Sequence, residues 1–283
     1  MAKKSTMTDE EKKAYGEMME QKKAEFMERR SEIAETLPLK NDFYKTYLNK
    51  LPFVKESCLN ALCIVKAEKK GFRFLSKRDW ISEMQEVKKG EEPLELLSCE
   101  SFTGRDGKSH PGYRLIYVYD NTQLEQPIDI VFKTWSLDEF ASALEESAQH
   151  LCTVKTGSIE GTHKIEYPAD DKPVLTMSDQ LDLKSLVGLF LLACAVNEVF
   201  LEKIDRYHSK KYIKNVSETA YDASYMLCVK FLGPDALDGF PVNAERMKDM
   251  DVKHINDELK AVRDTYTFLA GSVEYNLTKE TEE

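Results

Sequence analysis

The sequence lacks the patterns that mark most disulfide-bonded, secreted and membrane proteins. Its six cysteines include no C-x-x-C pair and no zinc-ribbon spacing, so we expect reduced cysteines in a cytoplasmic protein. The longest apolar run, residues 186–196, is too short to cross a bilayer, so we expect no membrane partner. The first residues carry no apolar segment of the kind found in secretory signals.

Signatures of several common catalytic sites are also missing. The chain contains no P-loop, no G-x-G-x-x-G and no G-x-S-x-G, which excludes the nucleotide-binding and serine-hydrolase sites that those motifs build. Its five histidines are scattered, and no two of them have the spacing of metal ligands. The acidic pairs Asp170/Asp171 and Asp179/Asp182 are interpreted as surface or capping residues rather than as a hydrolytic pair.

An overall positive charge is missing too, and the net charge of −10 argues against indiscriminate binding to nucleic acid. The charge is uneven, however. Residues 66–90 hold eight basic and four acidic side chains, a net charge of +4, whereas residues 160–283 hold 15 basic and 23 acidic ones, a net charge of −8. The basic segment is either a site for a local anionic ligand or an ordinary solvated surface.

The hydrophobic content of 42% supports a sizeable core in a chain of 283 residues. Apolar spacing of three and four residues predicts most of the chain to be helical, and Thr8 with Glu11 forms a capping box at the first helix. Ser136 and Glu139 form a second capping box. The helices are predicted over residues 8–37, 41–51, 54–69, 136–152, 181–207, 216–232 and 243–277, the last with a kink near 249–251.

Two short segments have the composition of β-strands. Leu94, Leu96 and Leu97 make one apolar strand, and residues 113–119 make a second that is rich in aromatic and β-branched side chains. The polar loop between them predicts a hairpin on a small antiparallel sheet. Residues 127–131 are interpreted as a strand extension, and residues 154–168 as a hairpin of short strands.

An ordered set of motifs surrounds this hairpin, namely Trp80, the V-K-K-G-E turn at 87–91, the Gly112-Tyr113 pair and the V-Y-D-N-T-Q run at 118–123. In this order the motifs resemble the N-terminal domain of ArdC-type antirestriction proteins and their LtrC-like relatives. Residues 57–62 resemble the Y-S-x-x-N-x-x-L helix of that family, with Glu56 where a tyrosine is usual. The resemblance covers residues 57–127, about a quarter of the chain.

The resemblance implies a surface that binds single-stranded nucleic acid. The candidate contacts are Arg73, Lys77, Arg78, Trp80, Lys88, Lys89, Tyr113 and Tyr117. A turn directs Lys88 and Lys89 outward, where their ammonium groups can meet phosphates. Trp80 is either a core residue or a stacking platform for a base.

Two further positions on this part of the chain have alternative roles. Tyr113, Tyr117 and Tyr119 share one face of their strand, which serves either as a platform for bases or as the contact with the first helices. Asn60 either makes a hydrogen bond that caps a loop inside the core or helps to shape the binding surface.

The same family continues into a metallopeptidase-like domain with H-E-x-x-H on a helix, which supplies two zinc ligands and a general base. In this chain Phe190 and Cys194 fall where the histidines belong, and Leu191 falls where the glutamate belongs. No histidine lies between His163 and His208, so a shift of register does not restore the motif. The E-x-x-A-E-x-x-A-Y segment of the family resembles residues 218–225, which places Tyr221 or Asp222 near the third ligand.

The expected fold is therefore α+β, with N-terminal helices and a small antiparallel sheet, followed by a mainly helical half that resembles an inactive zincin-like scaffold. We expect an N-terminal helix (1–37), a nucleic-acid-binding domain (38–135) and a degenerate peptidase-like domain (136–283). The missing motif predicts that the protein is not an enzyme and holds no metal or cofactor. A metal site built from Cys194, Asp222 and a distant histidine is the alternative.

Two functions remain open from the sequence. The first is a non-catalytic protein of a mobile element or phage that binds single-stranded DNA, or RNA, and protects DNA against host restriction. The second is an interaction module whose acidic C-terminal half binds a host defence or DNA-processing protein. The oligomeric state does not follow from the sequence.

Overall fold

The computed structural model describes residues 8–103, 109–169, 171–207 and 215–279. It is an α+β structure, as predicted, and it divides into two compact units. The first unit comprises residues 1–37 and 55–130, and the second comprises 38–54 and 131–283. The grouping differs from the predicted boundaries because residues 38–54 cluster with the C-terminal half.

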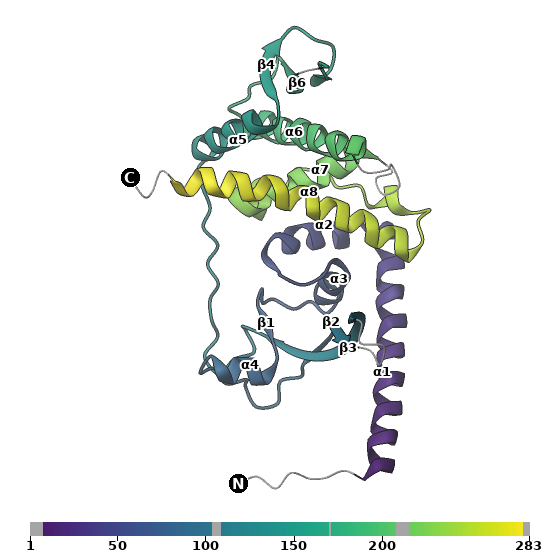
Figure 1. Ribbon diagram of the computed structural model, residues 1–283. Coiled ribbons are helices and arrows are strands. Elements are labelled where there is room, and N and C mark those ends of the chain that lie inside the picture. The colour runs from purple at the N-terminus through teal and green to yellow at the C-terminus, as the bar shows by residue number, and fades with distance from the viewer. Residues whose placement is uncertain (1–7, 104–108, 170, 208–214, 280–283) are drawn as a thin grey trace. The chain divides into compact units, whose positions relative to one another are not determined.

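The first unit combines helices with a three-stranded sheet (Figure 1). Its elements are α1 (Asp9–Thr36), α3 (Cys58–Lys66), β1 (Phe74–Leu75), α4 (Lys77–Ser82), β2 (Leu94–Thr103) and β3 (Ser109–Asp120). The strand order is β1-β3-β2, and both pairs are antiparallel. The capping box between Thr8 and Glu11 and the hairpin of β2 and β3 are confirmed. Residues 127–131 form a loop, so the predicted strand extension is wrong.

The core of the first unit lies between the hairpin and its helices. Phe26 of α1, Leu62 of α3 and Leu97 and Leu115 of the hairpin are buried. Leu97 and Leu115 are partners across β2 and β3, so both side chains lie on one face of the sheet. This pairing sets the register that places the tyrosines of β3 on the same face.

The second unit is built mainly from helices, which Figure 1 shows side by side. Its elements are α2 (Asn41–Lys50), α5 (Leu137–Leu151), α6 (Leu186–Tyr207), α7 (Val216–Leu232) and α8 (Val252–Lys279), with short 3-10 turns at Leu51–Phe53, Pro234–Leu237 and Ala244–Met247. The α7 helix packs against α2, α5, α6 and α8, and most of its side chains are buried. Its central placement explains why α7 is buried on most of its sides, including polar residues such as Asp222 and Ser224.

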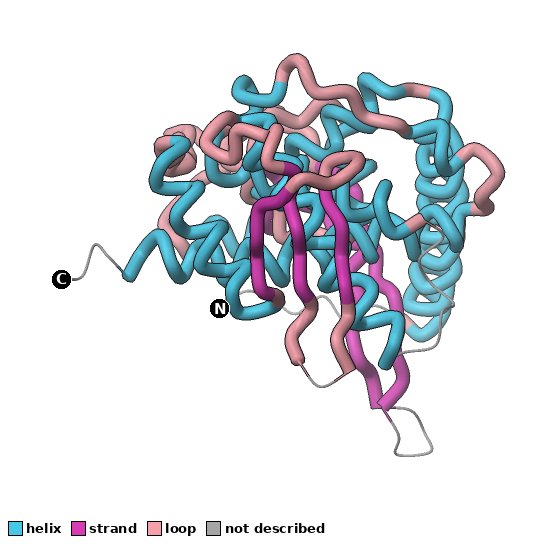
Figure 2. The backbone as a smooth tube through the Cα atoms, turned by 90° about the horizontal axis from the view of Figure 1, so that it is seen from above, coloured by secondary structure: helices cyan, strands magenta, loops and turns pink. Residues whose placement is uncertain are grey.

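A second small sheet belongs to this unit, and Figure 2 draws the strands in magenta. It contains β4 (Thr153–Gly157), β5 (His163–Glu166) and β6 (Val174–Ser178) in the order β4-β6-β5. The β4 strand runs parallel to β6, and β5 runs antiparallel to it. The predicted hairpin of residues 154–168 is wrong, because β6 lies between the two strands that would have paired.

Local sequence explains where the long C-terminal helices begin. A side chain at Gly188 would place its Cβ 2.0 Å from the carbonyl oxygen of Asp182, so only glycine permits the first turn of α6 to approach that loop. The predicted helix over 243–277 is two elements, a 3-10 turn (Ala244–Met247) and α8 (Val252–Lys279). Asp251 accepts a hydrogen bond from the backbone N–H of His254 and so caps α8. None of the described helices has the length and apolarity needed to cross a membrane.

Candidate nucleic-acid surface and the peptidase positions

The V-Y-D-N-T-Q run at the end of β3 holds the surrounding loops together. Asn121 Oδ1 accepts hydrogen bonds from the backbone N–H groups of Phe72 and Arg73 at 2.9 and 3.2 Å, and its Nδ2 donates to the carbonyl of Ile128 at 2.6 Å. Gln123 Nε2 donates to the carboxylate of Glu91 at 2.8 Å. The Asn121 and Gln123 side chains are buried and fully engaged. This motif therefore braces the fold and does not present its polar groups to a ligand.

Five of the residues predicted to contact nucleic acid are cations, and the structure shows which of them already have a partner within the protein. Arg73 pairs with Glu83, and Lys88 Nζ donates to the carbonyl of Thr122 at 3.1 Å, so both side chains have partners within the protein. Lys77 and Arg78 in α4 and Lys89 in the following turn are exposed. We call these three residues the basic surface. Unlike Arg73 and Lys88, these three residues have no partner in the described structure, so they can bind phosphates without breaking an interaction within the protein.

Trp80 is a core residue, which excludes the stacking platform that the sequence left open. Its side chain is 0% exposed. Its Nε1 donates to the carbonyl of Tyr119 at 2.9 Å, and the guanidinium of Arg73 lies 5.3 Å from the centre of the ring. The tryptophan thus joins α4 to the end of β3 and positions the basic surface without touching a ligand itself.

Tyr113 and Tyr117 lie further back along β3 and are partly exposed, at 51% and 37%. Tyr117 lines a groove of about 490 Å³ between α1, α3 and β2, which we call the α1 groove. Phe26, Arg29 and Ile33 supply the side of the groove that belongs to α1. The face of β3 that carries the tyrosines therefore contacts α1 and is also partly open to solvent. It can serve both as the contact with the first helices and as a platform for bases.

Asn60 makes the core hydrogen bonds expected of a structural residue. Its Nδ2 donates to the carbonyl of Leu97 at 2.8 Å, and its Oδ1 accepts from the N–H of the same residue at 3.3 Å. The side chain therefore pairs with the edge of β2 as a neighbouring strand would. Because Asn60 is 2% exposed, it does not shape the outer surface.

The predicted peptidase positions come together in the second unit, on neighbouring α6 and α7. The ring of Phe190 packs edge-on against Tyr221 with the centroids 4.8 Å apart, and Phe240 lies equally close. Burial raises the pKa of the Cys194 thiol to about 12, so this cysteine stays protonated. Leu191 contributes another apolar side chain. Phe190 and Leu191 carry no donor atom, and Cys194 is a single thiol, so these three positions do not fit a divalent metal ion, which requires several charged or lone-pair donors.

Asp222 belongs to a buried network of hydrogen bonds and ion pairs with Tyr44, Arg246 and Glu258. Its Oδ2 accepts hydrogen bonds from Tyr44 Oη and Arg246 Nη2, both at 2.6 Å. Arg246 also pairs with Glu258, whose Oε1 accepts from Thr219 Oγ1 at 2.6 Å. Burial raises the pKa of Asp222, and the charge of Arg246 opposes that rise. The guanidinium thus serves two buried carboxylates that would otherwise be costly to ionise.

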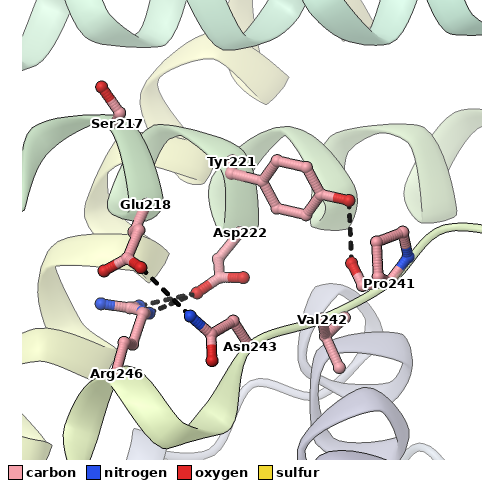
Figure 3. Close-up of a pocket in the computed structure, with 8 residues that line it drawn as sticks. All are labelled: Ser217, Glu218, Tyr221, Asp222, Pro241, Val242, Asn243 and Arg246. Atoms are coloured by element: carbon pink, nitrogen blue, oxygen red, sulfur yellow. Dashed lines mark hydrogen bonds and ion pairs between the residues drawn. The ribbon is translucent and has the colours of Figure 1, made fainter.

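A pocket of about 370 Å³ lies beside this network, between α7 and residues 241–246. Figure 3 shows Asp222 and Arg246 paired at its wall, Glu218 joined to Asn243, and the Tyr221 hydroxyl directed at the carbonyl of Pro241. Among the described residues, no three His, Cys, Asp or Glu side chains converge closely enough to hold a metal ion. The alternative site of Cys194, Asp222 and a distant histidine is therefore not assembled from the described residues.

Sequence reasoning found Asp222 but missed its partners. A carboxylate that is buried among helices needs a hydrogen-bond donor or a cation, so the sequence indicated that Asp222 has such a partner but not which residue it is. Tyr44, Arg246 and Glu258 lie on three other elements, and nothing in their local sequence connects them to α7. Arg30, on α1, was missed as well because it sits in a helix whose charges alternate in sign.

Two crystal structures resemble the chain. The metal-free structure of the antirestriction protein ArdC from plasmid R388 matches with a TM-score of 0.57 and 15% sequence identity, over 87% of this chain and 98% of that one. The Mn(II)-bound structure of ArdC from R388 matches with a TM-score of 0.50 and 17% identity, over 77% and 84% of the two chains. The sequence matches no family model and no curated protein. Over most of its length the chain thus has the fold of the antirestriction protein ArdC.

Proposed function

We propose that this protein is a non-catalytic, single-stranded nucleic-acid-binding protein that protects the DNA of a mobile element or phage against host restriction. The observation that carries the proposal is the first unit of an ArdC-like fold, where exposed cations lie on α4 and the turn after it and partly exposed tyrosines lie on β3. ArdC itself is an antirestriction protein, and the shared fold supports the same role here.

Electrostatics favours local rather than general binding. The basic surface belongs to a segment with a net charge of +4 in a chain with a net charge of −10. Phosphates would be attracted to Lys77, Arg78 and Lys89 and repelled by the acidic remainder, so contact is restricted to the first unit. Exposed aromatic rings favour unpaired bases, because a base within a duplex offers no free face for stacking.

The apolar residues at the peptidase positions support the non-catalytic part of the proposal. With Phe190 and Cys194 at the ligand positions and Leu191 at the position of the base, neither metal binding nor proton transfer has a side chain to perform it. We expect that Mn(II) or Zn(II) leaves the melting temperature unchanged and that elemental analysis finds no stoichiometric metal. A bound metal at one equivalent would contradict this proposal.

Fluorescence anisotropy with labelled single-stranded and duplex DNA tests the binding directly. We expect the single strand to bind more tightly and its affinity to fall steeply with salt. The substitutions Lys77→Glu, Arg78→Glu and Lys89→Glu should together weaken binding at least about tenfold, since each reverses a phosphate contact. Lys88 is left intact because its ammonium group braces the Thr122 loop.

The matched control reverses charge in the second unit. Lys248→Glu, Lys253→Glu and Lys260→Glu together change three exposed lysines and should leave the affinity nearly unchanged, apart from a small long-range effect. Equal loss in both variants would mean that net charge alone drives binding. Absence of binding to the single strand at low salt would overturn the proposed function.

The second unit supports a protein-binding function as the other candidate. Phe268 and Tyr275 lie seven residues apart on α8, so they share one helix face, and they are 44% and 68% exposed. An exposed aromatic pair in an acidic region is typical of a protein-binding surface. If this candidate is correct, capture of a host protein should be lost in Tyr275→Glu and preserved in the Lys77, Arg78 and Lys89 variant.

A further inference from the structure

Arg30 of α1 is a cation for which the described residues supply no counter-charge. Its side chain is partly buried, and burial lowers the pKa of its guanidinium. Within the described part of the chain, Arg30 takes part in no hydrogen bond or ion pair. A partly desolvated guanidinium gains more from an anion than a solvated one does, because the surrounding medium screens the attraction less.

The neighbouring arginine provides an internal comparison. Arg29 Nη2 donates to the carboxylate of Glu95 at 2.6 Å, and its guanidinium lies 5.2 Å from the ring centre of Phe26. Arg29 is therefore satisfied by the protein, although it is more exposed than Arg30. Among the residues that the structure describes, the better-buried of these two adjacent arginines is therefore the one without a partner.

The surroundings of Arg30 suit a nucleotide. Arg30 follows Phe26 by four residues and precedes Ile33 by three, so it shares the face of α1 that supplies these two residues to the α1 groove. Tyr113 lies on β3. Tyr117 lies on the same strand face four residues further on, which corresponds to about 13 Å along a strand. The same groove is also lined by Lys66, which is exposed near the end of α3. Its volume of about 490 Å³ lies in the range of pockets that take small organic ligands.

We propose that Arg30 and the α1 groove form a nucleotide site, in which Arg30 binds a phosphate and an unstacked base enters the groove beside Tyr117. This inference rests on the proposed function and places an essential contact outside the basic surface. The nucleic-acid strand would pass along β3 from Tyr113 to Tyr117. Arg30 would bind one phosphate, and Lys66 is close enough to the groove to bind another. Glu92 and Glu95 at the groove can accept hydrogen bonds from the amino groups of a base.

Charge reversal at one residue tests the phosphate contact. Arg30→Glu should lower the affinity for single-stranded DNA at least about tenfold and reduce the salt slope by about one. The matched control is Lys13→Glu, the same charge change on the same helix at an exposed position about 26 Å away along the axis. The control should change the affinity less than about twofold. An equal loss in both variants, or no loss in Arg30→Glu, would overturn the inference.

A second pair of variants tests the base contact without altering charge. Tyr117→Ala should weaken binding about tenfold, whereas Tyr117→Phe should retain most of the affinity because a phenyl ring still stacks. An oligonucleotide that contains 5-iodouracil should crosslink to the peptide with Tyr117 on irradiation. A crosslink confined to the second unit would contradict the site. Melting temperatures of all variants separate loss of contact from loss of fold, and Arg30→Gln replaces Arg30→Glu if the latter unfolds.

The result for the unmodified protein separates the two proposals. If it fails to bind single-stranded DNA, the proposed function and this site are both wrong. If it binds and Arg30→Glu with Tyr117→Ala binds as tightly, only the nucleotide site is wrong, and the basic surface carries the binding alone.

Discussion

The charged groups singled out in the two units differ in whether the protein itself pairs them. In the first unit Lys77, Arg78 and Lys89 stand in solvent, and Arg30 has no partner among the described residues. In the second unit the side chains of Arg246 and Asp222 are 4% and 3% exposed and pair with each other. This difference indicates that a ligand can bind to the charged groups of the first unit at a lower cost in free energy than to those of the second. A ligand of the first unit displaces water, whereas a ligand of the buried network would first have to break ion pairs.

The same contrast explains how an ArdC-like scaffold keeps its shape with apolar residues at the peptidase positions. Phe190 fills space against Tyr221 and Phe240 with aromatic contacts. Asp222 is neutralised by Arg246. Aromatic packing and an internal cation thus satisfy the buried groups of these helices.

The largest effect should come from removing the cation of the buried network. Arg246→Ala leaves the carboxylates of Asp222 and Glu258 buried without their counter-charge, so we expect the free energy of unfolding to fall by about 3–5 kcal/mol. Urea denaturation measures the change. The neighbouring exposed residue gives the control, since Lys248→Ala should be nearly neutral. An Arg246→Ala protein as stable as the original would mean that the network does not hold the second unit together.

A smaller effect is expected at Asn60, which is the first unit's own buried polar group. Asn60→Ala removes both hydrogen bonds to the backbone of Leu97 and leaves those groups unpaired in the core, which should cost about 1–3 kcal/mol. Thermal unfolding followed by circular dichroism would show it. If DNA affinity fell while the melting temperature stayed the same, Asn60 would belong to the binding surface and the structural assignment would be wrong.

The smallest effect concerns Glu198 and depends on pH. Burial raises the pKa of Glu198, but hydrogen bonds from His163 and Ser217 outweigh it and hold the pKa below its ordinary value. A depressed carboxyl pKa stabilises the fold above the unfolded value of about 4.3, and this stabilisation disappears as the pH falls through the folded value. Glu198→Gln should therefore be about 1 kcal/mol less stable at pH 7 and equal to the original at acid pH. A constant difference between pH 3 and pH 7 would contradict this linkage, and Glu202→Gln serves as the control.

Local patterns predicted most of the elements. The capping boxes at Thr8 and Ser136 and the period of the apolar residues located helices, because both depend on neighbours a few residues apart. The antiparallel pairing of β2 and β3 followed from composition in the same way. The β6 strand was missed because it lies between β4 and β5 in the sheet but follows both in the sequence. Its parallel pairing with β4 requires a crossover, which short sequence windows do not reveal.

The candidate sites were predictable only in part. The family resemblance placed Phe190 and Cys194 on one helix and Tyr221 or Asp222 on the next, and these helices, α6 and α7, pack together with Phe190 against Tyr221. That these are degenerate peptidase positions stays a prediction. The burial of Trp80 could not be decided beforehand, because a tryptophan among lysines fits a core residue and a stacking residue equally well. Arg30 could not be found at all, since its distinction is the absence of a partner, and that is a property of the folded chain.

Hydrogen–deuterium exchange of the full chain, with and without saturating single-stranded DNA, tests the central claim most directly. We predict slower exchange in α1 near Arg30, in α4 and along β3, with exchange in α6 and α7 unchanged by the DNA. Protection centred on α7 and residues 241–246, with none in the first unit, would show that the pocket beside Asp222 binds the strand and would contradict the account.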